Sequence, residues 1–475
     1  MKQMKKIGSL ILSTVILLSA MPMLPVFAED SDDPAGEAET MDAKITLSET
    51  SATADGKNVK IDGTKITVSA SGNYEFSGKL TDGQIVVNVE DTTLDAGTVK
   101  LFFNGVDITG VSDAAVYVVN AKKTSINIMD NTENFLYDGQ NYPEDTTAVI
   151  YAKDDLTIKS GGTAGNGKLN IVAKFQQGIH CSNDLKITGG DIDVKTEAAD
   201  GVRGKTSVEI KGGKLDVNAG GDGVKSTKGY VVISGGDTEI KASNDAVQGE
   251  KDVTDKDGTV HKGVLISGGS LKANGDRGLT NAGGEVEITG GTVVATAVKP
   301  VPKDGQTETK DNTFKISSAS TQPVLLFNTK EQQVKDQRVE LKNAGTDTAV
   351  VSKKANRKFD YALISSPDLT VGSKYELYIG GTKTEAGEIT IGEGITTLTD
   401  VVSTAAVEEP EIDPLDINAD GSVDVSDAVI LARFLAEDKT VKLVDGALSR
   451  IDTNNDGKNT ADDIIVILRH IARLD

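Results

Sequence analysis

Residues 200–221 read DGVRGKTSVEIKGGKLDVNAGG, and this stretch decides the fold. It holds three short alternations of apolar and polar residues, separated by small residues. Close copies precede it as QGIHCSNDLKITGGDIDVKTEAA at 177–199 and follow it as DGVKSTKGYVVISGGDTEIKASN at 222–244. Alternation with a period of two is typical of strands, and a regular period of 20–50 residues indicates stacked repeats.

The Gly-Gly pairs of five successive units begin at positions 189, 212, 235, 268 and 290, so the spacings are 23, 23, 33 and 22. The long spacing contains an insertion at 250–263. One unit cannot bury its apolar face alone, but stacked units would pair strands about 4.8 Å apart around a shared core. We therefore predict an all-β, right-handed parallel β-helix, a three-faced solenoid. Its equivalent isoleucines at 187, 210, 233, 266 and 288 should form an internal column.

The chain divides by composition into six segments. Residues 1–28 have a basic start, an apolar run and a small-residue end, which predicts a secretory signal peptide. We then expect a disordered acidic leader at 29–43, the repeat body at 44–310, a β-rich cap of the solenoid at 311–396, a linker at 397–414 and a small all-α calcium-loop domain at 415–475. The mature chain is thus expected to be secreted, without membrane insertion, and monomeric.

The charge of the chain restricts its partners. Its formal net charge is −22, and loss of the three lysines in the signal peptide would make it −25. Such a chain will not bind nucleic acid electrostatically. The single cysteine, Cys181, excludes an intramolecular disulfide, and we interpret it as a small buried hydrophobic residue.

The tail contains two loops with the oxygen-rich spacing of calcium sites, LDINADGSVDVSD from Leu415 and IDTNNDGKNTADD from Ile451. Hard oxygen ligands with a glycine at the sixth position are typical of such loops. The first loop offers Asp416, Asn418, Asp420, Asp424 and Asp427, with Ser422 giving its carbonyl. The second loop offers Asp452, Asn454, Asp456 and Asp463. It carries Asn459 and Thr460 where an apolar residue and a ligand are usual, so its site is expected to be weaker.

A short apolar helix follows each loop, AVILARFLAE and IIVILRHIARL, with no helix before the loop. This duplicated loop-helix resembles a type I dockerin. The resemblance implies docking to a cohesin domain of a scaffold protein, as in cellulosomes. It places partner contacts on Val425, Ser426, Ala432 and Arg433, with second-copy equivalents Ala461, Asp462, Leu468 and Arg469. The two sets differ, which puts a symmetric two-way docking mode in doubt.

The body resembles a family of secreted carbohydrate-binding β-helix proteins, through the segments GVDIT, DDLTI, DGVRGK, GGDGVKS and ISSPDL at 105, 154, 200, 220 and 364. The resemblance implies a pectate-lyase-like fold, calcium on the surface, and association with cellulose and pectic acid. These motifs are mainly architectural, so they specify the fold better than the activity.

Three aspartates, Asp200, Asp222 and Asp245, open successive units at one equivalent position. In a stack their carboxylates would lie about 5 Å apart, which is unfavourable without compensation. One interpretation is Ca²⁺ between adjacent turns. The other is that each aspartate hydrogen-bonds within its own turn, beside Arg203 and Lys225.

The leading functional hypothesis is noncatalytic, calcium-assisted binding of a cell-wall polysaccharide, with Arg203 and Lys225 contacting the sugar. The first alternative is a calcium-dependent lyase, in which one of these two cations takes the proton. Another alternative is a hydrolase, which would need two or three clustered aspartates. A further alternative is a structural or adhesive cell-surface protein, which would need no sugar-binding or catalytic site. The insertion at 250–263 and the loop at 130–145 are candidate groove walls.

Overall fold

The computed structural model describes residues 39–139, 146–300, 311–404, 413, 415–418, 423–436, 438, 441, 451–454 and 458–472. The predicted signal peptide lies outside these residues, as do most of the leader and half of the linker. Among the described residues, no helix is both long enough and apolar enough to span a bilayer.

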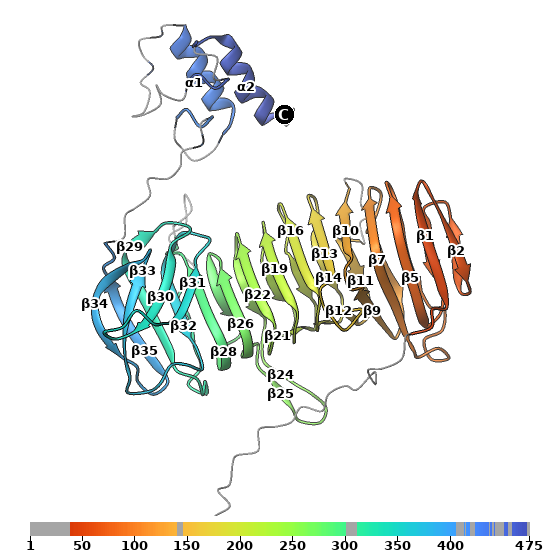
Figure 1. Cartoon of the computed structure of the whole chain (residues 1–475), viewed down its shortest axis with the longest axis horizontal. Helices are drawn as coiled ribbons and strands as arrows, with labels where there is room; N and C mark the ends of the chain where they lie inside the picture. The colour runs from red at the N-terminus through yellow and green to blue at the C-terminus, as the bar shows by residue number, and fades with distance from the viewer. Residues whose placement is uncertain are drawn as a thin grey trace, which may run out of the picture. The chain divides into compact units, whose positions relative to one another are not determined.

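The body is built from parallel strands that recur once per repeat in three columns (Figure 1). One column runs through β9 (Lys123–Ile128), β12 (Leu156–Ser160), β15 (Asp184–Ile187), β18 (Ser207–Ile210) and β21 (Tyr230–Ile233). A second runs through β10 (Glu133–Asp138), β13 (Lys168–Ala173), β16 (Asp191–Thr196), β19 (Lys214–Ala219) and β22 (Asp237–Ala242).

The third column forms a sheet of its own. It contains β4 (Lys65–Val68), β6 (Gln84–Asn88), β8 (Val116–Asn120), β11 (Ala148–Ala152), β14 (Gln177–Cys181), β17 (Val202–Gly204), β20 (Val224–Ser226), β23 (Asp245–Gly249) and β27 (Arg277–Asn281). The antiparallel strand β3 (Val59–Asp62) covers one edge of this sheet, which has 10 strands among the described residues.

The chain is all-β, as predicted, but the predicted right-handed parallel β-helix, a three-faced solenoid, is wrong. Among the described residues, the strands of the first and second columns belong to one 19-stranded sheet, which also includes three strands of the far end. This sheet and the 10-stranded sheet together enclose one apolar core, so there are not three separate faces. The reason is that β7 (Thr98–Gly110), β26 (Val264–Asn274) and β28 (Val286–Ala297) are long strands. β7 and β26 each pair with strands of both the first and the second column, and β28 pairs with β26 along its length, so the two columns belong to one sheet.

The internal isoleucine column is confirmed. Ile187, Ile210, Ile233, Ile266 and Ile288 are direct register partners from one repeat to the next. All five are buried, and they belong to one hydrophobic cluster that runs through the body. Cys181 is buried in the same cluster, so its interpretation as a small hydrophobic residue is also confirmed.

Antiparallel strands close both ends of the stack. At the start, β1 (Ala43–Glu49) pairs parallel with β5 (Gly72–Leu80) and antiparallel with β2 (Ser51–Gly56). At the far end, β32 (Phe359–Ser365) pairs antiparallel with β28, so the edge of the last repeat strand is covered.

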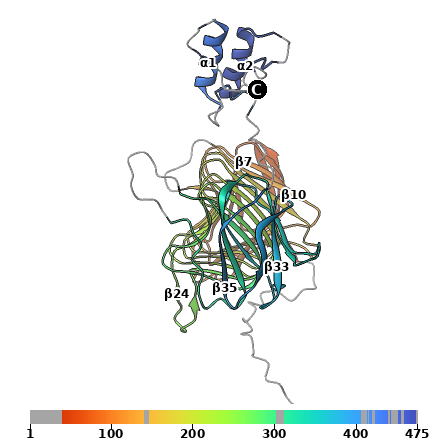
Figure 2. The same ribbon diagram turned by 90° about the vertical axis from the view of Figure 1, so that its left-hand side faces the viewer.

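The remaining strands of the far end have their own hydrophobic cluster. They are β29 (Val324–Gln333) and β35 (Ile395–Val401), with a four-stranded sheet of β31 (Ala349–Lys354), β30 (Arg338–Asn343), β33 (Lys374–Ile379) and β34 (Thr382–Thr390). The insertion at 250–263 forms a small hairpin of β24 (Val253–Thr254) and β25 (Val260–His261), which Figure 2 shows projecting from the body.

In the tail, helices α1 (Val425–Leu435) and α2 (Ala461–Ile471) begin within the last three residues of the two predicted loops. Each helix starts with a capping box. The N-cap side chain, Asp424 in α1 and Thr460 in α2, accepts from a backbone N–H of the first turn. The third helical residue, Asp427 or Asp463, accepts from the backbone N–H of that N-cap residue. Leu431 of α1 and Ile467 of α2 are buried in a shared cluster, so the helices pack on each other.

Candidate functional site

The three predicted aspartates do stack, and each carboxylate has partners. The backbone N–H of Asp222 donates to Asp200 Oδ1 at 3.0 Å, and that of Asp245 donates to Asp222 Oδ1 at 3.0 Å. A cation accompanies each carboxylate: Arg203 lies 3.6 Å from Asp200, Lys225 contacts Asp222, and Arg277 donates from Nε to Asp245 at 2.6 Å. This geometry favours the hydrogen-bonding interpretation with one difference: Asp200 and Asp222 pair with cations of their own turn, but they accept backbone hydrogen bonds from the next turn.

Burial raises the pKa of Asp200 and of Asp245, despite the opposing backbone hydrogen bond at Asp200 and the opposing Arg277 at Asp245. Because these carboxylate oxygens already contact a backbone N–H group or a cationic side chain, no aspartate of the column offers two free oxygens to a calcium ion. Within the part of the chain that the structure describes, no group of three or more His, Cys, Asp and Glu side chains is arranged to hold a metal ion. Calcium ligation by this aspartate column therefore stays a prediction.

Arg203 and Lys225 belong to a longer row of side chains on the outer side of the 10-stranded sheet. We call this row the outer ladder. Its members are register partners on successive strands and are all half-buried: Tyr117, Tyr151, His180, Arg203, Lys225, Gln248 and Thr280. Their inward neighbours, such as Val202 and Val224, lie in the core. With about 4.8 Å between strands, seven rungs extend over about 29 Å.

The first half of the outer ladder is aromatic. The rings of Tyr117 and Tyr151 lie 5.6 Å apart between centroids, and His180 meets Tyr151 edge-on at 5.0 Å. Lys153 lies over Tyr117 at 5.3 Å from the ring centroid. A tyrosine ring can cover an apolar surface while its hydroxyl group forms a hydrogen bond, which suits a partner that has both apolar and polar groups.

The second half of the outer ladder carries two cationic hydrogen-bond donors, and a carboxylate balances the charge of each. Lys225 is held by Asp222, whereas Arg203 makes one longer ion pair, and its buried Nε has no hydrogen-bond partner. Arg203 is therefore the less firmly held of the two predicted cations. Because each of them is matched by a carboxylate, the ladder has donors without a net positive charge.

His180 should stay neutral across the physiological range. Burial, with smaller effects of Arg203 and Lys205, lowers the pKa of its imidazole to about 4. Its Nδ1 lies 2.8 Å from Thr147 Oγ1, which fixes the ring.

We expect the imidazole of His180 to titrate near pH 4 in the folded protein, well below its pKa of about 6.5 in the unfolded chain. The unfolded state then binds more protons, so His180 should lower the free energy of unfolding as the pH falls from 6.5 towards 4. NMR titration of the imidazole signals checks this, since the chain has 3 histidines. A midpoint near pH 6.5 would contradict the buried environment.

Three predicted calcium ligands of the tail, Asp424, Asp427 and Asp463, lie at the starts of the two helices. Asp416 and Asp427 are buried, and Asp427 accepts from the backbone N–H of Asn418 at 3.0 Å and of Asp424 at 2.9 Å. In the second loop, Asp463 accepts from Asn454 at 3.2 Å. Asp452 is also described, whereas Asp420, Ser422 and Asp456 lie outside the described residues. Buried carboxylates on hard-oxygen loops fit Ca²⁺.

Both helices expose apolar side chains on the surface where partner contacts were predicted. On α1, Val425 is exposed with Ser426 and Arg433, and Ala432 is half-buried. The sequence reasoning missed Val429, which is 48% exposed, and Ile465 on α2, which is 50% exposed. The signal was available, because Val429 and Ile465 stand four residues after Val425 and Ala461, on the same helix face.

Residues 62–321 match the family model described as "Carbohydrate-binding domain-containing protein", and residues 414–472 match the type I dockerin domain. The first match covers more than half of the chain, so the chain belongs to the family of carbohydrate-binding domain-containing proteins. The resemblance of the tail to a type I dockerin is confirmed.

A carbohydrate-binding domain-containing protein of Acetivibrio thermocellus is 38% identical over 162 residues, which are 33% of this chain and 54% of that protein. The chain thus spans about half the length of that curated relative. A solved structure described as the polysaccharide lyase-like protein from C. thermocellum, in a gadolinium derivative, has 33% sequence identity. It matches with a TM-score of 0.42 over 52% of this chain and 94% of that chain.

Proposed function

We propose that the body binds an extended cell-wall polysaccharide along the outer ladder without cleaving it, and that the dockerin attaches the protein to a cohesin of a secreted, cellulosome-type scaffold. The observation that carries this proposal is the in-register row of two tyrosines, a neutral histidine and two hydrogen-bonding cations. Its rung spacing of about 4.8 Å is comparable to the length of one sugar unit in an extended chain. Successive sugars would therefore meet successive rungs.

The charge balance of the ladder favours a neutral polymer such as cellulose over pectic acid. Arg203 and Lys225 already face Asp200 and Asp222, so a uronate would have to compete with these carboxylates. We assign calcium to the dockerin loops and not to the contact between sugar and ladder. Whether sugar binding depends on calcium, as the sequence predicts, is therefore measured by comparing binding with calcium and with chelator.

The same ion pairs argue against the lyase alternative. A catalytic base must be free to take a proton from the substrate, whereas the amino group of Lys225 is already paired with the nearly buried Asp222. Arginine stays protonated in proteins, so Arg203 would need further assistance. Lyase activity can be tested directly, because the unsaturated product of a lyase absorbs ultraviolet light.

We expect Tyr151→Ala to reduce retention on amorphous cellulose about fivefold, because loss of an aromatic contact costs about 1 kcal/mol. Co-sedimentation of the full secreted chain measures retention, and ultraviolet absorbance with polygalacturonate is followed in parallel, with calcium and with chelator. Tyr361, a half-buried tyrosine on β32, provides the control variant Tyr361→Ala.

Retention by the wild type and the control, with flat absorbance, supports the proposal. Rising absorbance that depends on Arg203 or Lys225 would make the body a lyase. Equal retention of Tyr151→Ala and wild type would remove the outer ladder as the binding surface. Absence of retention on any polymer would favour a structural or adhesive protein.

A further inference from the structure

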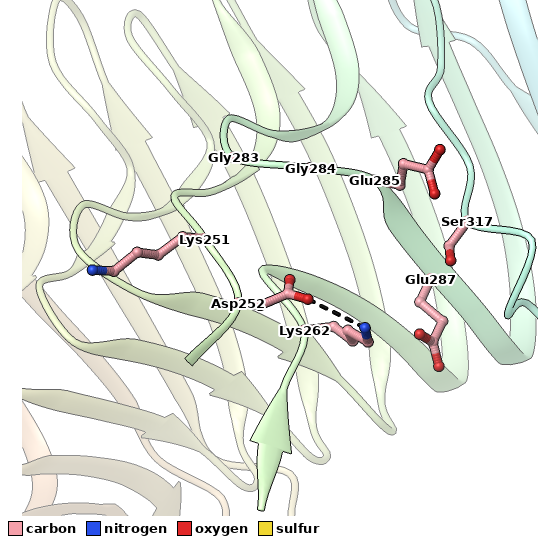
Figure 3. Close-up of a pocket in the computed structure, with 8 residues that line it drawn as sticks. All are labelled: Lys251, Asp252, Lys262, Gly283, Gly284, Glu285, Glu287 and Ser317. Carbon is pink, nitrogen blue, oxygen red and sulfur yellow. Dashed lines mark hydrogen bonds and ion pairs between the residues drawn. The ribbon is translucent and has the colours of Figure 1, made fainter. Parts of the chain in front are cut away.

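A polar cavity of about 340 Å³ lies beside the last rungs of the outer ladder. Figure 3 shows the residues that line it: Lys251, Asp252, Lys262, Gly283, Gly284, Glu285, Glu287 and Ser317. Lys251 and Gly283 follow Gln248 and Thr280, the last two rungs, by three residues each. Its volume is at the lower end of the range for small-molecule sites, which suits a ligand of one or two sugar units.

The insertion at 250–263 builds one wall of this cavity. Lys262 Nζ and Asp252 Oδ2 lie 3.2 Å apart, and Asp252 Oδ1 accepts from the backbone N–H of Gly263 at 2.8 Å, so the two ends of the insertion are joined. Within the hairpin, His261 stacks on Tyr230 of the body with centroids 4.4 Å apart and planes at 6°. The insertion that breaks the repeat spacing is therefore fixed against the body.

The opposite wall carries a carboxylate oxygen without a partner. Glu287 lies on β28, and its Oε2 is shielded from solvent without a hydrogen-bond partner. In contrast, Asp252 in the same cavity accepts from both Gly263 and Lys262. A buried acceptor without a partner destabilises the folded protein, more so when it is charged, so a ligand that donates to Glu287 would recover this loss.

The cavity as a whole disfavours acidic ligands. Three carboxylates (Asp252, Glu285 and Glu287) face two lysines (Lys251 and Lys262), which leaves one net negative charge. Adjacent sugar hydroxyls can donate together to the two oxygens of a carboxylate, and a lysine ammonium can donate to a hydroxyl or ring oxygen. An uncharged sugar supplies both kinds of group.

We propose that this cavity binds a single uncharged sugar unit, the end or a side branch of a chain that lies on the outer ladder, with Glu287 accepting from its hydroxyls and Lys262 donating to it. This inference rests on the proposed function. It adds a second, small-molecule subsite, which would recognise soluble sugars that are too short to span the ladder.

The test titrates the full secreted chain, with calcium present, with cellobiose, mannobiose, galactobiose and digalacturonate by calorimetry. At least one uncharged disaccharide should bind, and Glu287→Ala should weaken it about tenfold, as expected for the loss of a hydrogen bond to a charged group. Glu287→Gln, which keeps the shape and one acceptor, should fall between the two. Glu393→Ala, at an exposed glutamate of the far end, is the matched control.

Unchanged disaccharide binding in Glu287→Ala would overturn the inference, and so would a preference for digalacturonate. Loss of one bound calcium ion in this variant, without any effect on sugars, would identify a cation site instead. If cellulose is retained but no disaccharide depends on Glu287, the cavity proposal fails and the ladder proposal stands. If a disaccharide binds in a way that depends on Glu287 but no polymer is retained, the ladder proposal fails and the cavity proposal stands.

Discussion

Gly236→Ala is expected to lower the free energy of unfolding of the body by about 3 kcal/mol. Gly236 has φ +78°, a conformation that costs a residue with a Cβ about 1–2 kcal/mol. A Cβ there would also lie 2.6 Å from the carbonyl oxygen of Gly213, the equivalent glycine one repeat earlier. Neighbouring turns would have to separate, which costs about a further 1–3 kcal/mol.

Gly258 in the insertion hairpin provides the matched control. Its φ is +91°, but nothing lies within 4 Å of a Cβ built on it. Gly258→Ala should therefore show the dihedral cost alone, about 1–2 kcal/mol, and any effect should remain local to the hairpin. Differential scanning calorimetry of both variants measures the difference. Equal shifts would show that the close approach of adjacent turns does not contribute to stability.

The repeat and its register could be predicted because the apolar positions alternate with a constant spacing between units. The division into sheets could not. In the preceding unit β21 ends at Ile233, before Gly235 and Gly236, whereas β26 continues through Gly268 and Gly269 with a register irregularity next to Ile266. Whether a strand bends or ends at a Gly-Gly pair depends on hydrogen bonds to both neighbouring turns, and the local sequence is the same in either case.

The candidate site was predicted in part. The equivalence of Asp200, Asp222 and Asp245 follows from the repeat, but their partners depend on geometry, because the backbone N–H of the next turn competes with a cation for each carboxylate. Arg277 was missed as the third cation, since it replaces the aspartate at the equivalent position of its repeat.

The aromatic half of the outer ladder was also missed. Tyr151 occurs in an earlier, looser repeat unit, AVIYAKDDLTIKSGG at 148–162, so an alignment of that unit with QGIHCSNDLKITGG would have placed it beside His180. Cavity-lining residues such as Glu287 and Lys262 come from different repeats and from the insertion. Only the folded chain shows that they meet.

Removal of calcium is expected to abolish most of the helical circular dichroism of the full chain and to leave the unfolding temperature of the body unchanged. Helices α1 and α2 are the only helices of the described residues, and both begin at a loop with predicted calcium ligands. Asp427 and Asp463 are buried with their charges held by backbone N–H groups at the helix starts. Bound calcium would neutralise further carboxylates of the loops, so its removal leaves them mutually repelling.

Asp427→Asn combined with Asp463→Asn should reproduce the effect of chelator on the helices, because each variant side chain loses its charge and one acceptor oxygen. Asp438→Asn is the control, since Asp438 pairs with Arg433 outside both loops. Binding to a type I cohesin should be lost with the helical signal, since the exposed apolar residues are ordered only on folded helices. A lower unfolding temperature of the body in chelator would instead indicate calcium within the repeats, and would restore the aspartate column as its first candidate site.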